Sequence, residues 1–394
     1  MTAYLDHAAT TPMLPEALAA MAGELSQPGN ASSLHSSGRR ARRIVEESRE
    51  QLAAALGARP HEVVFTAGGT EADNLAVKGL FWQRHGENPR RRRILASAVE
   101  HHAVLDPLVW LAEHEGAEVV WLPVDHVGRV DVGALRAEIE RDADSIALVT
   151  VMWANNEVGT VQPISDVTAA AAAHGIPVHS DAVQAVGALV VDFEVSGLDA
   201  LTMTGHKLGG PVGAGALLLR RGVELTPVTH GGGQERGVRS GTLDAPAVRA
   251  LAVATAAAVS RQPHESERVA DLRDDLVAGV QRVVPDAVLQ GDPDPAGRLP
   301  GNAHLAFPGC EGDSLLYLLD ARGVECSTGS ACQAGVPQPS HVLRAMGLDD
   351  ATARGALRFS LGHTSTGADV GALVGAIGPV VERARTAGLA RVSR

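Results

Sequence analysis

The chain has 394 residues, with 34 Lys and Arg against 46 Asp and Glu, so its formal net charge is −12. This acidic balance argues against a general nucleic-acid-binding protein, which needs a basic face for phosphates. Hydrophobic residues make up 45 % of the sequence and cysteines number three, which excludes a disordered chain and a disulfide framework. The longest apolar run, at 250–259, is shorter than the roughly 20 residues of a membrane span. We therefore expect a soluble, cytoplasmic protein, with two domains at roughly 150 residues per domain.

Strand-like apolar runs alternate with helical patterns over the first two thirds of the chain. The predicted strands are, in order, 62–66, 93–97, 118–122, 146–153, 177–181, 200–204 and 215–220. Helical patterns lie between most of them, such as the one predicted over 164–174. The alternation predicts an α/β layer with a mostly parallel sheet.

The pattern changes near Pro246. A long helix is predicted over about 246–284, followed by a strand at 303–307 and helices at 313–321 and 368–387. We place a domain boundary within 250–260, where the regular alternation of strands and helices ends.

A glycine turn, Thr66-Ala67-Gly68-Gly69-Thr70, joins the first long strand to the helix that follows it. Such a turn directs free backbone N–H groups and the helix dipole at one point, which suits a phosphate. A glycine turn with a capping threonine is also a common way to begin a helix. On its own, the turn leaves both interpretations open.

Two further candidate residues follow strands. Asp181 ends the strand 177–181, at the edge where open α/β sheets bind ligands, and its carboxylate could hold a proton on a heterocyclic nitrogen. Lys207 follows the strand 200–204, and a partly desolvated lysine can form a Schiff base. The alternatives are a helix-capping aspartate and a solvated loop lysine. Glycine turn, acid and lysine together indicate a pyridoxal-phosphate site.

In this combination the sequence resembles the cysteine desulfurases of the class V aminotransferase family, in particular the actinobacterial housekeeping enzymes. The matching motifs cover nearly the whole chain, at 4–12, 29–32, 69–71, 100–104, 155–159, 181 with 184, 205–207, 230–235, 239–242, 329–332 and 358–362. The resemblance implies the fold-type I pyridoxal-phosphate architecture. A large domain at 16–255 would hold a seven-stranded, mostly parallel sheet. A smaller α+β domain would comprise 1–15 and 256–394.

The resemblance also implies a role for each site residue. Lys207 would hold the cofactor covalently and move protons, and His101 would stack on the cofactor ring. The other expected cofactor contacts are Gly69, Thr70, Asn156, Asp181, Gln184, Thr204, Gly205, His206 and, across a homodimer, Thr242 of the partner subunit. Asn30 and Arg358 would bind the carboxylate of the substrate, L-cysteine.

Cys332 lies in a stretch, about 326–340, that is rich in Gly and Pro and poor in large apolar residues. This composition is typical of an exposed, mobile loop. Cys326 and Cys310 fit small buried residues better. A mobile thiolate suits a sulfur carrier. The resemblance implies that L-cysteine becomes L-alanine, leaving on Cys332 a persulfide that passes to an iron–sulfur scaffold or a tRNA-thiolation protein. It leaves open whether Cys332 also ligates an iron–sulfur cluster transiently.

Three other functions compete with this interpretation. Within the same fold, an aminotransferase has no need of the thiol loop, whereas a selenocysteine lyase differs in its substrate. A non-catalytic, partner-binding scaffold could lose Lys207, Asp181 or Cys332 without harm, yet all three are present. A resident metal site is not expected, because His101-His102 has no i, i+4 partner and no Cys-x-x-Cys occurs. We expect no direct nucleic-acid or membrane partner.

Overall fold

The computed structural model describes residues 2–329 and 339–392. Its largest sheet has seven strands in the order β2-β8-β7-β6-β5-β3-β4. Their bounds are β2 (Val63–Thr66), β3 (Arg93–Ser97), β4 (Glu118–Leu122), β5 (Ile146–Thr150), β6 (Val178–Asp181), β7 (Ala200–Thr204) and β8 (Gly215–Leu219). Within this sheet β8 alone runs antiparallel to its neighbours. The predicted seven-stranded, mostly parallel sheet is therefore confirmed.

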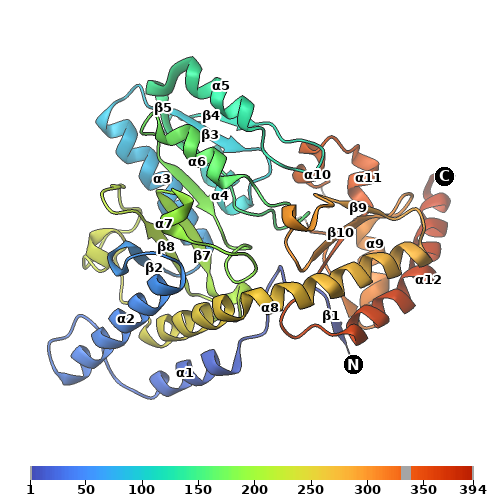
Figure 1. Cartoon of the computed structure of the whole chain (residues 1–394), viewed down its shortest axis with the longest axis horizontal. Helices are drawn as coiled ribbons and strands as arrows, with labels where there is room; N and C mark the ends of the chain where they lie inside the picture. The colour runs from blue at the N-terminus through green and yellow to red at the C-terminus, as the bar shows by residue number, and fades with distance from the viewer. Residues whose placement is uncertain (1, 330–338, 393–394) are drawn as a thin grey trace.

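Helices cover both faces of this sheet (Figure 1). They are α1 (Pro15–Leu25), α2 (Ser36–Ala55), α3 (Gly69–Glu87), α4 (His102–His114), α5 (Val132–Asp142), α6 (Ile164–Ala172), α7 (Phe193–Ser196) and α8 (Ala245–Val283). One apolar core includes Leu80 of α3 and Leu108 of α4, and the other includes Leu52 of α2 and Leu251 of α8. Burial on both faces explains why the central strands are continuous apolar runs.

Short 3₁₀ turns occupy several of the connections. They are η1 (Pro60–Glu62), η2 (Ala143–Ser145), η3 (Gly205–Lys207), η4 (Glu235–Gly237) and η5 (Pro295–Gly297). The turn η3 follows β7 directly, so the end of that strand places Lys207.

The remaining elements form a smaller α+β part. Its strands are β1 (Ala3–Tyr4), β9 (Val288–Gln290), β10 (Asn302–Ala306), β11 (Val324–Glu325) and β12 (Ala356–Ser360), and its helices are α9 (Gly312–Asp320), α10 (His341–Ala345), α11 (Asp350–Arg354) and α12 (Gly367–Val392). The strands β12, β10 and β9 form an antiparallel sheet, whereas β1 pairs in parallel with β11. The amino terminus therefore joins the smaller part of the molecule.

The 39-residue helix α8 spans the two parts (Figure 1). Its first half packs against α1 and α2, and α12 also packs against it. Small buried residues such as Ala250 and Ala254 allow a close approach in the first half. The division predicted between residues 255 and 256 falls inside this continuous helix, and the predicted domain bounds stay a prediction.

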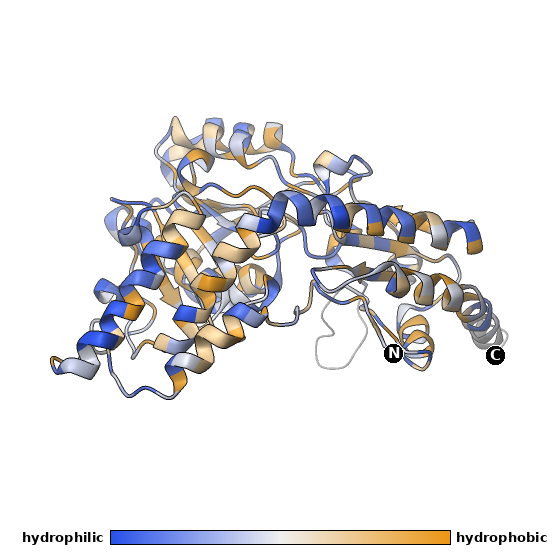
Figure 2. Ribbon diagram, turned by 60° about the horizontal axis from the view of Figure 1, so that its bottom comes forward, coloured by the Kyte–Doolittle hydropathy of each residue, from blue (hydrophilic) through white to orange (hydrophobic). Residues whose placement is uncertain are grey.

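The predicted elements are present, with small differences at their ends. The strand predicted over 146–153 ends at Thr150, and the one predicted over 303–307 covers Asn302–Ala306. Helices carry both hydrophilic and hydrophobic residues, as expected where one face packs and the other meets water (Figure 2). Over the described ranges, no helix has the length and hydropathy needed to cross a membrane.

A buried ion pair ties α2 to the strand that precedes the glycine turn. The two terminal guanidinium nitrogens of Arg49 donate to Glu235, Nη1 at 2.9 Å and Nη2 at 2.6 Å, and the same carboxylate accepts the Phe65 N–H at 2.8 Å. Glu235 adopts a positive φ of 45° to reach this position. Both side chains are at most 5 % exposed, so each charge depends on the other.

We expect Glu235→Ala to lower the free energy of unfolding by about 3–5 kcal/mol, because it removes the buried carboxylate that balances the guanidinium charge and leaves a strand N–H without its partner. Urea unfolding measures the change. The matched control is Glu46→Ala, which removes the exposed partner of the same arginine and should cost about 0–1 kcal/mol. Equal losses in the two variants would contradict the prediction.

Candidate functional site

A cavity of about 400 Å³ lies where β5, β6 and β7 end. Ten of the predicted site residues line it: Gly69, Thr70, His101, Asn156, Asp181, Gln184, Thr204, His206, Lys207 and Arg358. Ligands of open α/β sheets bind at this edge because the carboxyl ends of parallel strands converge there. The candidate residues from widely separated motifs therefore meet in one place.

Lys207 lies in the wall of this cavity. Its Nζ donates to the carbonyl oxygens of Ala8 at 2.5 Å and Ala9 at 2.6 Å. Burial, reinforced by the positive charge of Arg358, lowers the pKa of Lys207 to about 8. The chain has one other lysine, Lys78, whose ammonium lies 4.5 Å from the centre of the Trp110 ring. This two-lysine composition is a signal that sequence reasoning could have used.

The glycine turn provides a cradle for an anion at the start of α3. Gly68 is the N-cap with a φ of 144° and no side chain, so the first helical N–H groups face outward. A Cβ on Gly69 would lie 3.0 Å from a methyl of Val183, so a residue with a side chain would fit here only if Val183 moved. Thr204 and His206 line the same cavity. Backbone N–H groups, a hydroxyl and an imidazole together suit a phosphate.

Asp181 is buried at the end of β6, where its Oδ1 accepts the N–H of Val183 at 2.8 Å. Burial, together with the negative charge of Asp73, raises its pKa to about 8. A carboxyl in this position favours its neutral form until a positive partner arrives. A protonated ring nitrogen is such a partner, and it would return the group to its charged form.

His101 caps α4, and its Nδ1 accepts the N–H of Ala103 at 3.1 Å. The surrounding protein, together with the nearby Lys207 ammonium, lowers the pKa of His101 to about 4. The ring is therefore neutral at pH 7. With Nδ1 accepting, its proton lies on Nε2.

Arg358 on β12 brings a buried guanidinium to the cavity. Its NH2 contacts Asp6 Oδ1 at 2.8 Å, and NH1 donates to the carbonyl of Asn156 at 2.9 Å. Nε is buried and has no hydrogen-bond partner among the described residues. Two of its five N–H donors are used in these contacts, so the guanidinium retains donors that an incoming carboxylate could satisfy.

Other predicted residues lie elsewhere. Asn30 is exposed, and its Oδ1 accepts the N–H of Ser32 at 2.9 Å rather than facing the cavity. Thr242 is exposed and does not line the cavity, while Gly205 is buried behind it, within η3. Cys332 lies outside the described residues.

Sequence reasoning missed how the amino-terminal segment closes the site. Besides the lysine contacts, Gln184 Nε2 donates to the Ala8 carbonyl at 3.0 Å, and Asp6 binds Arg358. The motif at 4–12 was matched, but its backbone carbonyls carry no signal in a residue pattern. These contacts depend on the pairing of β1 with β11.

The residues present fit pyridoxal phosphate. A glycine cradle with hydroxyl and imidazole neighbours suits the phosphate, and a lysine of lowered pKa suits the aldehyde. The buried Asp181 suits the ring nitrogen, as argued above. Over the described ranges, no group of three or more His, Cys, Asp or Glu side chains could hold a metal ion.

Comparisons with known proteins agree with this fit. The family described as Aminotransferase class-V matches residues 3–373. An IscS-like cysteine desulfurase of Mycobacterium tuberculosis is 59 % identical over 388 residues, covering 98 % of each chain. The cysteine desulfurase IscS of Dictyoglomus turgidum is 40 % identical, covering 97 % of this chain and 95 % of its own. A solved NifS-like protein has a TM-score of 0.89 at 34 % identity, covering 97 % of this chain and all of that one.

Lys207 should bind an added aldehyde faster than an ordinary lysine does, because about one molecule in ten has a neutral amine at pH 7, against fewer than one in a thousand for an unperturbed lysine. We expect the rate at which the cofactor-free protein takes up pyridoxal phosphate to rise about tenfold per pH unit and to level above pH 8. Absorbance measures the rate, and borohydride trapping with peptide mapping locates the label. Label on Lys78, or a rate still rising at pH 10, would contradict the prediction.

Proposed function

Since the chain belongs to the class V aminotransferase family and is a pyridoxal-phosphate-dependent cysteine desulfurase, we propose that Cys332 takes the sulfur of L-cysteine and that L-alanine is released. The observation that carries the proposal is the single cavity that joins Lys207, His101, Asp181 and Arg358. A lysine, a proton donor, an acid and a carboxylate-binding arginine are the parts that this reaction requires.

The cofactor would be held by the groups described above. The turn at Gly69 and Thr70, with Thr204 and His206, would bind the phosphate, and Asp181 would pair with the ring nitrogen. Bound there, pyridoxal phosphate supplies an electron sink for charge that develops at the substrate α-carbon. Gln184 and Asn156 line the cavity and would contact the polar edge of the ring.

Arg358 would orient the substrate. Its buried Nε lacks a partner, and its guanidinium already faces the cavity. A carboxylate accepting from this donor would hold the substrate in one orientation, with its α-carbon toward Lys207. Asn30 was expected to share this task, yet it does not line the cavity. The proposal therefore assigns carboxylate recognition to Arg358.

Lys207 and His101 would move the protons. With a pKa near 8, the Lys207 amine can take a proton from the α-carbon and return it at neutral pH. His101, which lines the cavity and carries its proton on Nε2, would exchange that proton at the reacting sulfur. The Cys332 thiolate attacks the substrate sulfur, so an S–S bond forms and the C–S bond breaks. The β-carbon of the substrate keeps the electron pair of the broken C–S bond and gains a proton, which completes L-alanine.

The described cysteines support this choice of nucleophile by exclusion. Burial raises the pKa of Cys326 to about 12, and burial also raises that of Cys310. Neither forms a thiolate readily. The segment with Cys332 begins and ends beside the cavity, where Ser327, Gly329 and His341 are lining residues.

A homodimer and a sulfur acceptor complete the proposal. The motif residue Thr242 is exposed and lies outside the cavity of its own chain, which agrees with a role in the partner subunit's site. As the family resemblance implies, the acceptor would be an iron–sulfur scaffold or a tRNA-thiolation protein. The predicted cytoplasmic location and a transient cluster-ligating role for Cys332 stay predictions.

Replacing the thiol separates cofactor binding from sulfur transfer. We expect Cys332→Ser to keep the absorption of the bound cofactor while alanine production from L-cysteine falls by at least a hundredfold, since a hydroxyl cannot accept the sulfur. Alanine is quantified in single-turnover and steady-state assays. Cys326→Ser is the matched control and should keep most of the activity. Wild-type alanine production by Cys332→Ser would sink the proposal.

Arg358→Lys tests carboxylate recognition. Lysine keeps the charge but lacks the guanidinium fork, so the KM for L-cysteine should rise roughly tenfold or more. The absorption of the bound cofactor should not change. Steady-state kinetics over a range of L-cysteine concentrations provides the measurement. An unchanged KM would remove Arg358 from substrate binding.

A further inference from the structure

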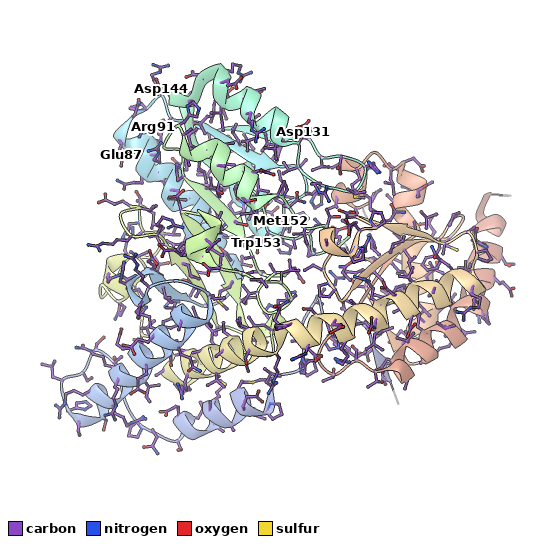
Figure 3. All side chains as sticks on the ribbon, in the orientation of Figure 1. Glu87, Arg91, Asp131, Asp144, Met152 and Trp153 are labelled. Atoms are coloured by element: carbon purple, nitrogen blue, oxygen red, sulfur yellow. The ribbon has the colours of Figure 1, made fainter. Side chains whose placement is uncertain are left out.

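Three carboxyl groups are buried around one end of the cavity. Asp73 on α3, Glu100 after β3 and Asp181 on β6 are 1 %, 0 % and 4 % exposed. Two consecutive residues link Glu100 to Asp181, because the Met152 N–H donates to Glu100 Oε1 at 2.7 Å and the Trp153 N–H donates to the Asp181 backbone carbonyl at 2.8 Å. Asp73 joins them through His179 on β6, whose Nε2 lies 3.5 Å from Asp73 Oδ1. Figure 3 shows this pair at the centre of the molecule. The three acids therefore belong to one buried cluster.

Little positive charge faces this cluster. His179 lies on the same face of β6 as Asp181, and its Nε2 is 3.1 Å from Thr202 Oγ1 and 3.5 Å from Asp73 Oδ1. Burial lowers the pKa of His179 to about 4, so this imidazole is neutral. Lys207 faces Asp181, whereas Arg358, which lines the same cavity, is already paired with Asp6. Three ionised carboxylates would thus have little positive charge to balance them.

Two of the carboxyl groups each have one oxygen without a hydrogen bond. Asp73 Oδ1 and Glu100 Oε2 have no hydrogen-bond partner in the part of the chain that the structure describes. An ionised oxygen that is buried and unpaired is costly, whereas a protonated group is not. Burial accordingly raises the pKa of Asp73 to about 7 and that of Glu100 to about 8. Asp181 differs because, among the described residues, neither of its oxygens is both buried and unpaired, and its Oδ1 accepts the Val183 N–H.

We propose that Asp73 and Glu100 are neutral acids in the working enzyme, so that Asp181 alone carries negative charge toward the cofactor ring. Both are positioning residues, because they act through Asp181 and not on the substrate. A second negative charge would oppose ionisation of Asp181 and weaken its pairing with the ring nitrogen. The inference rests on the proposed role of Asp181 and deepens it.

The cofactor-free full-length chain provides the first test. An acid that is neutral only when folded makes stability fall as pH rises from about 5 to 8, because the unfolded chain has already released that proton. Histidines whose pKa is lowered by folding make stability rise with pH below about pH 6.5. Their contribution is the same in the wild type and in each variant, so it cancels in the comparison. The unfolding equilibrium constant should therefore rise less steeply with pH in Asp73→Asn and in Glu100→Gln than in the wild type. The difference should be up to about tenfold per pH unit for each variant.

Asp166→Asn is the matched control for that test, since it makes the same change on the exposed face of α6 and should leave the pH slope at its wild-type value. Wild-type slopes in both Asp73→Asn and Glu100→Gln would overturn the proposal. Because this measurement needs neither cofactor nor turnover, it stands even if the proposed function fails.

Infrared spectra of the holoenzyme at pH 6.5, compared between the wild type and each variant, test the same assignment directly. The carbonyl stretch of a protonated carboxylic acid should be present in the wild type, with one component missing in Asp73→Asn and another in Glu100→Gln. Asp181→Asn should remove none. A wild-type spectrum without such a band, or loss of a component in Asp181→Asn, would overturn the proposal, and the wild-type spectrum decides even if the variants fail to fold.

Discussion

The buried guanidinium of Arg358 joins the segments that surround the cavity. It binds Asp6 from the amino terminus and the carbonyl of Asn156, while its backbone exchanges two hydrogen bonds with Ser327, at 2.7 and 3.2 Å. Its buried charge needs these partners, because removing one partner of a buried ion pair lowers the free energy of unfolding by about 3–5 kcal/mol. The smaller sheet, the amino-terminal segment and the start of the cysteine segment are therefore held against the large sheet at one point.

That arrangement also sets the electrostatics of the site. Asp6 holds the segment whose Ala8 and Ala9 carbonyls bury Lys207. Burial then moves three groups of the site toward their neutral forms, lowering the pKa of Lys207 and His101 and raising that of Asp181. A cofactor with an anionic phosphate and a cationic ring nitrogen brings the charges that this cavity otherwise lacks. The protein thus favours a ligand whose charges complement the buried groups of the cavity.

Much of the large sheet and part of the site could be predicted because their signals are local. Alternating strands and helices give a parallel sheet, and the carboxyl ends of its strands meet at one edge. Asp181 ends a predicted strand, and Gly69 and Lys207 each follow one, so their convergence could be expected before any coordinates. The resemblance added His101, Gln184 and others, which the cavity also brings together.

The sequence by itself determined that strands alternate with helices and which residue types lie near the strand ends. The tertiary structure decided that Asp6 meets Arg358 across 352 positions and that Asn30 and Thr242 lie outside the cavity. It also showed that three carboxyls share one buried cluster. Local patterns depend on neighbours in the chain, whereas burial and pairing depend on packing between distant segments, and packing sets the charge state of a site.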